Sequence, residues 1–152
     1  MDYNGTTLSI PLMPATQIQG AIVQHLQDNA GLFALPIPLE QIRRASDVSG
    51  EPKDAFGVIV ATADMGDHFG GSQRVLVDIR ATVTAFTHIN EDEDGLQCAA
   101  LATDVLNLMQ GMTYNLDGWR VYSTGNWTTS APVISGNYRQ IVLEATIPIG
   151  VM

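Results

Sequence analysis

The residues best suited to chemistry are acids, and four of them stand in a row, Glu91, Asp92, Glu93 and Asp94. A run of carboxylates can hold Ca²⁺, but this run lacks the alternating ligand spacing and the central glycine of an EF-hand loop. An apolar run with helical spacing follows directly, and the positive end of a helix dipole favours acids. We therefore interpret the run as a helix N-terminus that projects into solvent or into a channel.

A second polar group, Asp64, Asp67 and His68, lies in the turn-rich stretch 63–73. Carboxylates and imidazole are metal ligands, but three such residues within five positions, with no second cluster, form a weak pattern. We favour a hairpin loop here. An α+β enzyme or a ligand- or metal-binding module that uses these three residues remains the alternative.

Motifs for other chemistry are missing from the sequence. There is no serine in a Gly-x-Ser-x-Gly turn, no Walker loop, no dinucleotide fingerprint and no His-Glu-x-x-His. The single cysteine, Cys98, falls near the apolar side of a helix, which favours a small buried hydrophobe over a reactive thiol. We expect no catalytic residue, no metal site, no cofactor and no enzymatic activity.

The composition favours one domain with a real core. The chain has 152 residues, 45% of them hydrophobic and only 15% charged, and its formal net charge is −9. Because its few cations are scattered, tight binding to nucleic acid or to an anionic membrane is disfavoured. No basic region with an apolar core opens the sequence, and no apolar run approaches the length of a membrane span, so we expect neither a signal peptide nor a membrane segment.

The elements that position these acids follow from hydrophobic periodicity. A long amphipathic helix is expected within 89–112, with Gly111 as a left-handed residue at its end. A first helix is expected over 16–31, with Thr16 as its N-cap. The stretch 39–44 fits either a short strand or a turn of helix. Strands are expected at 56–63, 74–89, 119–127 and 138–151, with a loop at 128–137.

Alternation is clearest in two of these strands. The expected inward residues are Val75, Val77, Ile79, Ala81, Val83 and Ala85 in the first strand, and Ile141, Leu143, Ala145, Ile147 and Ile149 in the second. Pro148 should place the end of the last strand at a sheet edge or in a departing tail. The order predicts an α+β fold, with a mostly antiparallel sheet of about four to five strands and two main helices packed on one face.

Residues 1–15 form an expected extended arm ahead of a single domain at 16–152. Leu8, Ile10 and Leu12 alternate with small or polar residues, and Pro11 and Pro14 disfavour a helix. We expect the arm to dock on its own sheet edge or on a neighbouring subunit.

The layout resembles a known family over roughly residues 16–150. The acid-led helix with ALATDVLNLMQG is followed by a DGWRV strand and a closing YRQIVLEATIPI strand. In order and texture this is similar to phage tail terminator proteins, also called tail completion or head–tail joining proteins. The resemblance implies a virion protein, assembled in the host cytoplasm, that forms a ring, typically a hexamer, on the head-proximal end of the tail tube. Another ring-forming tail-tube or head-closure subunit is the competing possibility.

A terminator would contact the tail tube protein and the head connector, while DNA passes through its channel without specific binding. Candidate residues for an acidic channel lining are Asp64, Asp67, Glu91, Asp92, Glu93 and Asp94. Candidate subunit contacts are Leu8, Ile10, Leu12, Ile147 and Ile149.

Overall fold

The protein is built on a seven-stranded mixed sheet that carries two helices. The computed structural model describes residues 2–3, 6–7, 13–44, 57–71 and 74–151. The helices are α1 (Pro14–Asp28) and α2 (Leu96–Gln110), and short 3-10 turns span Ala30–Leu32, Leu39–Gln41 and Ile89–Glu91. The strands of the sheet are β3 (Ile42–Arg44), β4 (Gly57–Gly71), β5 (Arg74–His88), β6 (Trp119–Val121), β7 (Thr128–Thr129), β8 (Val133–Ser135) and β9 (Tyr138–Val151).

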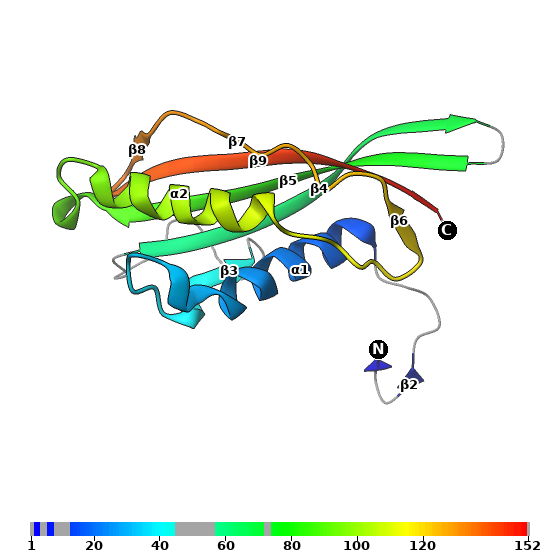
Figure 1. Ribbon diagram of the computed structural model, residues 1–152, viewed down its shortest axis with the longest axis horizontal. Coiled ribbons are helices and arrows are strands. Elements are labelled where there is room, and N and C mark those ends of the chain that lie inside the picture. Colours follow the sequence, from blue (N-terminus) through cyan, green and yellow to red (C-terminus); the bar gives the residue numbers. More distant parts are fainter. Residues whose placement is uncertain (1, 4–5, 8–12, 45–56, 72–73, 152) are drawn as a thin grey trace.

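The α+β class is confirmed, but the expected count of four to five strands is too low. The main path of the sheet is β3-β4-β5-β9-β6, and β7 and β8 also pair with β9 (Figure 1). All these pairs are antiparallel except β3 with β4, which is parallel. Four of the strands have only two or three residues, which is too short for alternation to reveal them. The stretch 39–44 contains both expected forms, a 3-10 turn and then β3.

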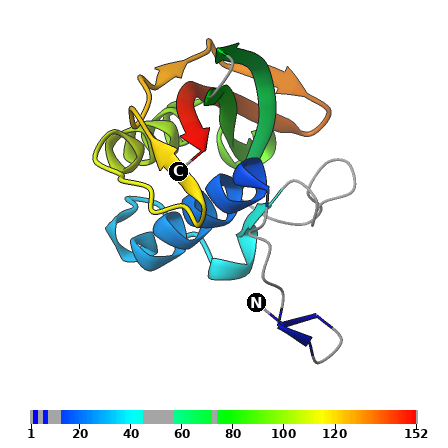
Figure 2. The same cartoon turned by 90° about the vertical axis from the view of Figure 1, so that its right-hand side faces the viewer.

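The predicted alternation of the two longest apolar strands is confirmed over the described side chains. On β5, the residues from Val77 to Ala85 at every second position are buried, and on β9 the same holds from Ile141 to Ile149. Both helices cover this face, since their apolar residues join the same core cluster. Viewed from its end, the sheet is strongly curved around them (Figure 2).

Pro148 does not mark an edge strand, contrary to expectation. β9 is paired on both sides, with Pro148 opposite Asp78 of β5, while the backbone carbonyl of Pro148 accepts from the Tyr122 N–H 2.9 Å away. An amide N–H at this position would point to the same side as the carbonyl, toward the end of β6. The missing donor therefore costs one bond where the β6 ladder already stops at Val121.

The stretch 63–73, expected to be a hairpin loop, also differs from expectation. β4 continues through it to Gly71, and its pairing with β5 shifts register between Met65 and His68. A bulge inserts extra residues without ending a strand, so the backbone ladder with the strongly alternating β5 overrides the local turn composition. In Figure 1 the two strands leave the body of the protein as a long hairpin.

The chain between α2 and β9 also differs from expectation. The strand expected at 119–127 covers only β6, and the loop expected at 128–137 contains β7 and β8. Gly136 has a φ of 60° in the turn that joins β8 to β9, a conformation that suits glycine. Trp127 is buried in the core between β6 and β7.

The first helix begins two residues earlier than Thr16. Pro14 is its first residue, where the missing N–H costs nothing because the first helical N–H groups lack intrahelical partners anyway. The expected arm therefore ends before Pro14. In the arm, the described pieces β1 (Asp2–Tyr3) and β2 (Thr6–Thr7) pair only with each other, as a separate two-stranded sheet.

Side chains of α1 tie this helix to the rest of the fold. Gln17 exchanges two hydrogen bonds with the backbone of Asp117, at 3.0 and 2.7 Å. Gln19 donates to the Ala61 carbonyl of β4 at 2.9 Å. His25 is half-buried and donates from Nε2 to the Leu108 carbonyl of α2 at 3.0 Å. These bonds satisfy backbone groups that secondary structure leaves open.

No helix among the described residues is long and apolar enough to cross a membrane.

Candidate functional site

The acid run is divided by the fold into one buried carboxylate and three exposed ones. Asp92 is 1% exposed, whereas Glu91, Glu93 and Asp94 lie on the surface. A 3-10 turn at Ile89–Glu91 and a left-handed Gly95, with a φ of 78°, turn the chain so that Asp92 faces inward. The helix itself begins only at Leu96, after the acids. Asp92 therefore cannot line a channel, and that part of the expected lining is wrong.

Asp92 caps the N-terminus of α2, because Gly95, the residue at the N-cap position, has no side chain. Its Oδ1 accepts from the Gln97 N–H at 3.0 Å, and its Oδ2 accepts from the Cys98 N–H at 3.0 Å and from the Thr87 hydroxyl at 2.8 Å. Asp94 accepts from the Leu96 N–H at 3.1 Å. Three of the first N–H groups of the helix are thereby satisfied by carboxylates.

Arg139 of β9 completes this buried cluster. Its Nη1 lies 3.5 Å from Asp92 Oδ2 and also donates to the Asp92 carbonyl, and its Nη2 donates to the Glu93 carbonyl at 3.2 Å. Burial alone would raise the pKa of Asp92, but the hydrogen bonds from Thr87, Gln97 and Cys98 and the charge of Arg139 together lower it. The cluster joins the end of β5, the start of α2 and the start of β9.

Cys98 lies next to this cluster and is fully buried. Its thiol contacts the Ala85 and Arg139 carbonyls at 3.6 and 3.7 Å. Burial raises the pKa of this thiol, and the nearby Asp92 carboxylate adds to the rise. The thiolate form that a nucleophile needs is therefore disfavoured, which agrees with the interpretation of Cys98 as a small core residue.

Asp64 and Asp67 lie far from the acid run. Asp64 is exposed and opposite Arg80 of β5, whereas the acid run follows His88 at the other end of that strand. Eight residues of strand separate these points, a distance of about 26 Å. Asp67 lies on β4 inside the bulged register. Among the described residues, no three His, Cys, Asp or Glu side chains are grouped so that they could hold a metal ion.

The residues expected to make subunit contacts have two different outcomes. Ile147 and Ile149 are 0% exposed in the core of the subunit, so they are not available to a neighbour. This part of the expectation is wrong because both residues point to the helix-covered face of a central strand. Leu8, Ile10 and Leu12 lie outside the described residues.

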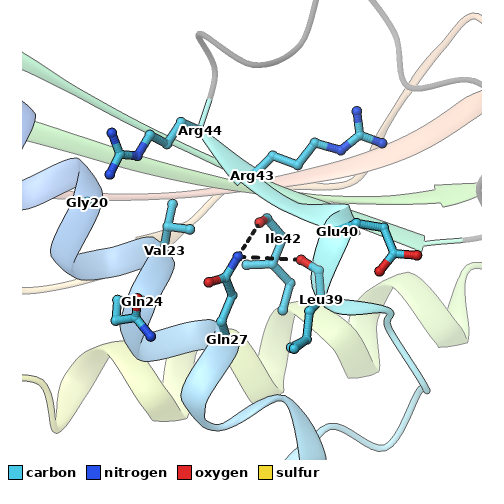
Figure 3. A pocket seen from close by; sticks show the side chains of 9 residues that line it. All are labelled: Gly20, Val23, Gln24, Gln27, Leu39, Glu40, Ile42, Arg43 and Arg44. Carbon is cyan, nitrogen blue, oxygen red and sulfur yellow. Dashed lines mark hydrogen bonds between the residues drawn. The ribbon is translucent and has the colours of Figure 1, made fainter.

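A hollow that sequence reasoning missed lies between α1 and β3 (Figure 3). Its volume is about 390 Å³, and Gly20, Gln24 and Gln27 of α1 face Arg43 and Arg44 across it. Gly20 matters for the packing here, since a Cβ at that position would lie 3.0 Å from Arg44 Nη2. Figure 3 shows Gln27 bonded to the carbonyls of Leu39 and Ile42, which holds the 3-10 turn and β3 against the helix. In the sequence, only the adjacent pair of arginines hinted at this hollow.

The edge of β4 is the second feature that the sequence did not reveal. β3 covers only Ile59–Ala61 of this edge, and Gln19 caps the Ala61 carbonyl where β3 ends. From Thr62 to Gly71, within the described part of the chain, β4 pairs only with β5. An unpaired strand edge is a template for strand addition by another chain.

Comparisons with known proteins add no identification, since neither the models of known protein families nor the curated proteins contain a match to this chain.

Proposed function

We propose that this chain is a structural virion subunit that forms a ring at the head-proximal end of a phage tail tube. The ring ends tube polymerisation and joins the tail to the head connector. The proposal starts from the resemblance of the chain to tail terminators in the order and texture of its elements. In this proposal, the subunits of the ring contact one another through protein surfaces and use no cofactor.

The observation that carries the proposal is the open edge of β4 on a hairpin that leaves the body of the protein (Figure 1). Its ten residues, from Thr62 to Gly71, have backbone groups on one side that no described strand pairs. A hairpin of this kind can add to the sheet of a neighbouring subunit. The bulge near Met65 restricts pairing along the edge, which limits indiscriminate strand addition.

The charge of the chain also supports the proposal. A channel for DNA must not hold the phosphate backbone, and acids along its wall repel phosphates. With a net charge of −9, each subunit can supply such a wall. Asp64 and Asp67 on the hairpin are the candidates, with the exposed acids Glu91, Glu93 and Asp94 as a second group.

Native mass spectrometry over a concentration series, with and without Mg²⁺, tests the proposal. A single closed oligomer, in particular a hexamer, is the expected result. Open-ended polymers would instead indicate a tail-tube subunit, and a chain that stays monomeric at every concentration would contradict ring formation by the free protein.

A DNA-retention assay tests the acidic wall. The assembled wild-type protein should not retain duplex DNA, whereas an Asp64→Lys, Asp67→Lys variant should retain it with an affinity that falls steeply with salt. Arg120→Glu serves as a control outside the hairpin. If the lysine variant retains no more DNA than wild type, these two acids do not line the path of the DNA.

A further inference from the structure

Two surfaces of the molecule have opposite character, and the first is basic and apolar. The hollow between α1 and β3, lined by Arg43 and Arg44, adjoins an apolar hollow of about 440 Å³ lined by residues 30–31 and 36–39. Leu39 lines both. Leu39 and the nearby Leu32 are 54% and 71% exposed, which is high for leucine. We call this surface the arginine hollow.

Among the described residues, the charges in the arginine hollow are incompletely paired. Arg43 bonds to Gln41, but its Nε is buried and has no partner in the described structure. Arg44 is exposed, and neither arginine forms an ion pair with a described residue. Glu40 also lines the hollow, so Arg43, Arg44 and Glu40 together carry a net charge of +1. Positive charge of this kind is notable in a chain whose net charge is −9.

The second surface is acidic and apolar. Glu91 and Glu93 are exposed beside Leu96, which is 68% exposed at the start of α2. Ile134 of β8 lies at the same end, because it pairs with Arg139, whose guanidinium holds the Glu93 carbonyl. Ile134 is 60% exposed. We call these four residues the acidic tip. β8 and the start of α2, which carry two of them, lie at the left of Figure 1.

The two surfaces do not meet within one chain. Through Val60 of β4, the strand register places Arg43 level with Thr84 of β5, two strands away. His88, where the acid run follows, lies four residues further along β5. Arg43 and His88 are therefore separated by roughly 16 Å. In the described structure the only ion pair is Arg139 with Asp92. Among the described residues, each surface therefore presents charge without an ion-pair partner next to exposed apolar side chains.

We propose that the acidic tip of one copy of this chain docks into the arginine hollow of a second copy. The charges are complementary, and each charged group lies beside an apolar one, so burial and electrostatics favour the same arrangement. Because the two surfaces differ, the contact is heterologous, and repeating it generates a closed ring or an open filament. The inference rests on the proposed function and names the contact between subunits of that ring. It assigns Glu91 and Glu93 to the contact and leaves Asp64 and Asp67 to the channel.

A charge swap tests the contact. Arg44→Glu places a carboxylate against Glu93 of the neighbour, and Glu93→Arg places a guanidinium against Arg44. Each variant alone should associate with itself about tenfold more weakly or worse, because like charges facing each other across an interface are strongly unfavourable. An equimolar mixture should recover assembly, since it contains one reversed pair and one wild-type pair at alternating contacts. Arg120→Glu, an equal change of charge at another exposed arginine, should assemble like wild type.

Self-association is measured by analytical ultracentrifugation, after thermal melts confirm that each variant folds. The inference is overturned if Arg44→Glu assembles as well as Arg120→Glu, if the mixture of folded variants does not recover, or if the wild type stays monomeric. A wild type that forms a closed ring unaffected by Arg44→Glu leaves the proposed function standing without this contact. If the wild type forms open polymers and Arg44→Glu prevents their formation, this contact is supported and the proposed closed ring is not.

Discussion

Replacing Asp92 with alanine should destabilise the fold strongly, although its exposed neighbours Glu91 and Glu93 can be replaced at little cost. The substitution removes an acceptor of three hydrogen bonds and the only described carboxylate partner of Arg139. Loss of a helix cap costs about 1 kcal/mol, and the Thr87 hydroxyl, in a residue that is 0% exposed, would lose its partner at a further cost of about 1–3 kcal/mol. Since breaking a buried ion pair costs about 3–5 kcal/mol in total, we expect a loss in that range.

Urea denaturation at pH 7 measures the loss, with Glu93→Ala as the control. The Glu93 side chain is exposed, and only its backbone carbonyl bonds to Arg139, so the control should change the unfolding free energy by less than about 0.5 kcal/mol. Equal stabilities for the two variants would refute the assignment of Asp92 as the buried cap.

The pH dependence gives a second test of the same residue. The folded pKa of Asp92 is lowered from its ordinary value of 3.8, so its contribution is complete above that value and is lost as the pH falls through the folded pKa. The stability difference between wild type and Asp92→Asn should therefore be constant near neutral pH and shrink below about pH 4. A difference that does not change with pH would show that Asp92 carries no charge-dependent stabilisation.

Three further substitutions test the fold around this cluster and the sheet. Gly95→Ala should cost about 1–2 kcal/mol, because Gly95 has a φ of 78° and a Cβ there would lie 3.0–3.2 Å from the Arg139 side chain. Gly111→Ala should instead be neutral or stabilise the protein by up to about 1 kcal/mol, since the φ of Gly111 is −94° and nothing lies within 4 Å of an added Cβ. Thermal melts in which Gly111→Ala is less stable than Gly95→Ala would contradict the roles given to both glycines. Ile147→Ala should cost about 2–5 kcal/mol by urea denaturation, whereas Val151→Ala, at an exposed position, should cost less than about 0.5 kcal/mol. If Ile147→Ala is as stable as the wild type and fails only to assemble, Ile147 is a subunit contact and not a core residue.

The sequence predicted the elements whose information is local. β5 and β9 were recognisable because alternation repeats over many residues, and the apolar stripe of α2 was recognisable because it repeats at helical spacing. Gly111 was expected to be left-handed, but the left-handed residue is Gly95 at the other end of α2. A glycine permits that conformation without requiring it, so the local pattern could not decide between the two.

The site depended on contacts between distant parts of the chain, which local patterns do not contain. Four consecutive acids are equivalent in the sequence, and Asp92 differs from the others only because Arg139, 47 residues away, and Thr87 surround it. Arg43 and Arg44 line a hollow because α1 packs across β3 through Gln27. The extension of β4 to Gly71 likewise depends on β5, since its own composition indicates turns.

The central claim is that the chain closes into a single ring, and single-particle cryo-electron microscopy of the assembled wild-type protein tests it most directly. We expect one closed ring with an axial channel, in which β4 hairpins meet neighbouring subunits and acidic tips lie in arginine hollows. Particles that are open-ended stacks, or only monomers under conditions in which the protein is folded, would contradict the claim.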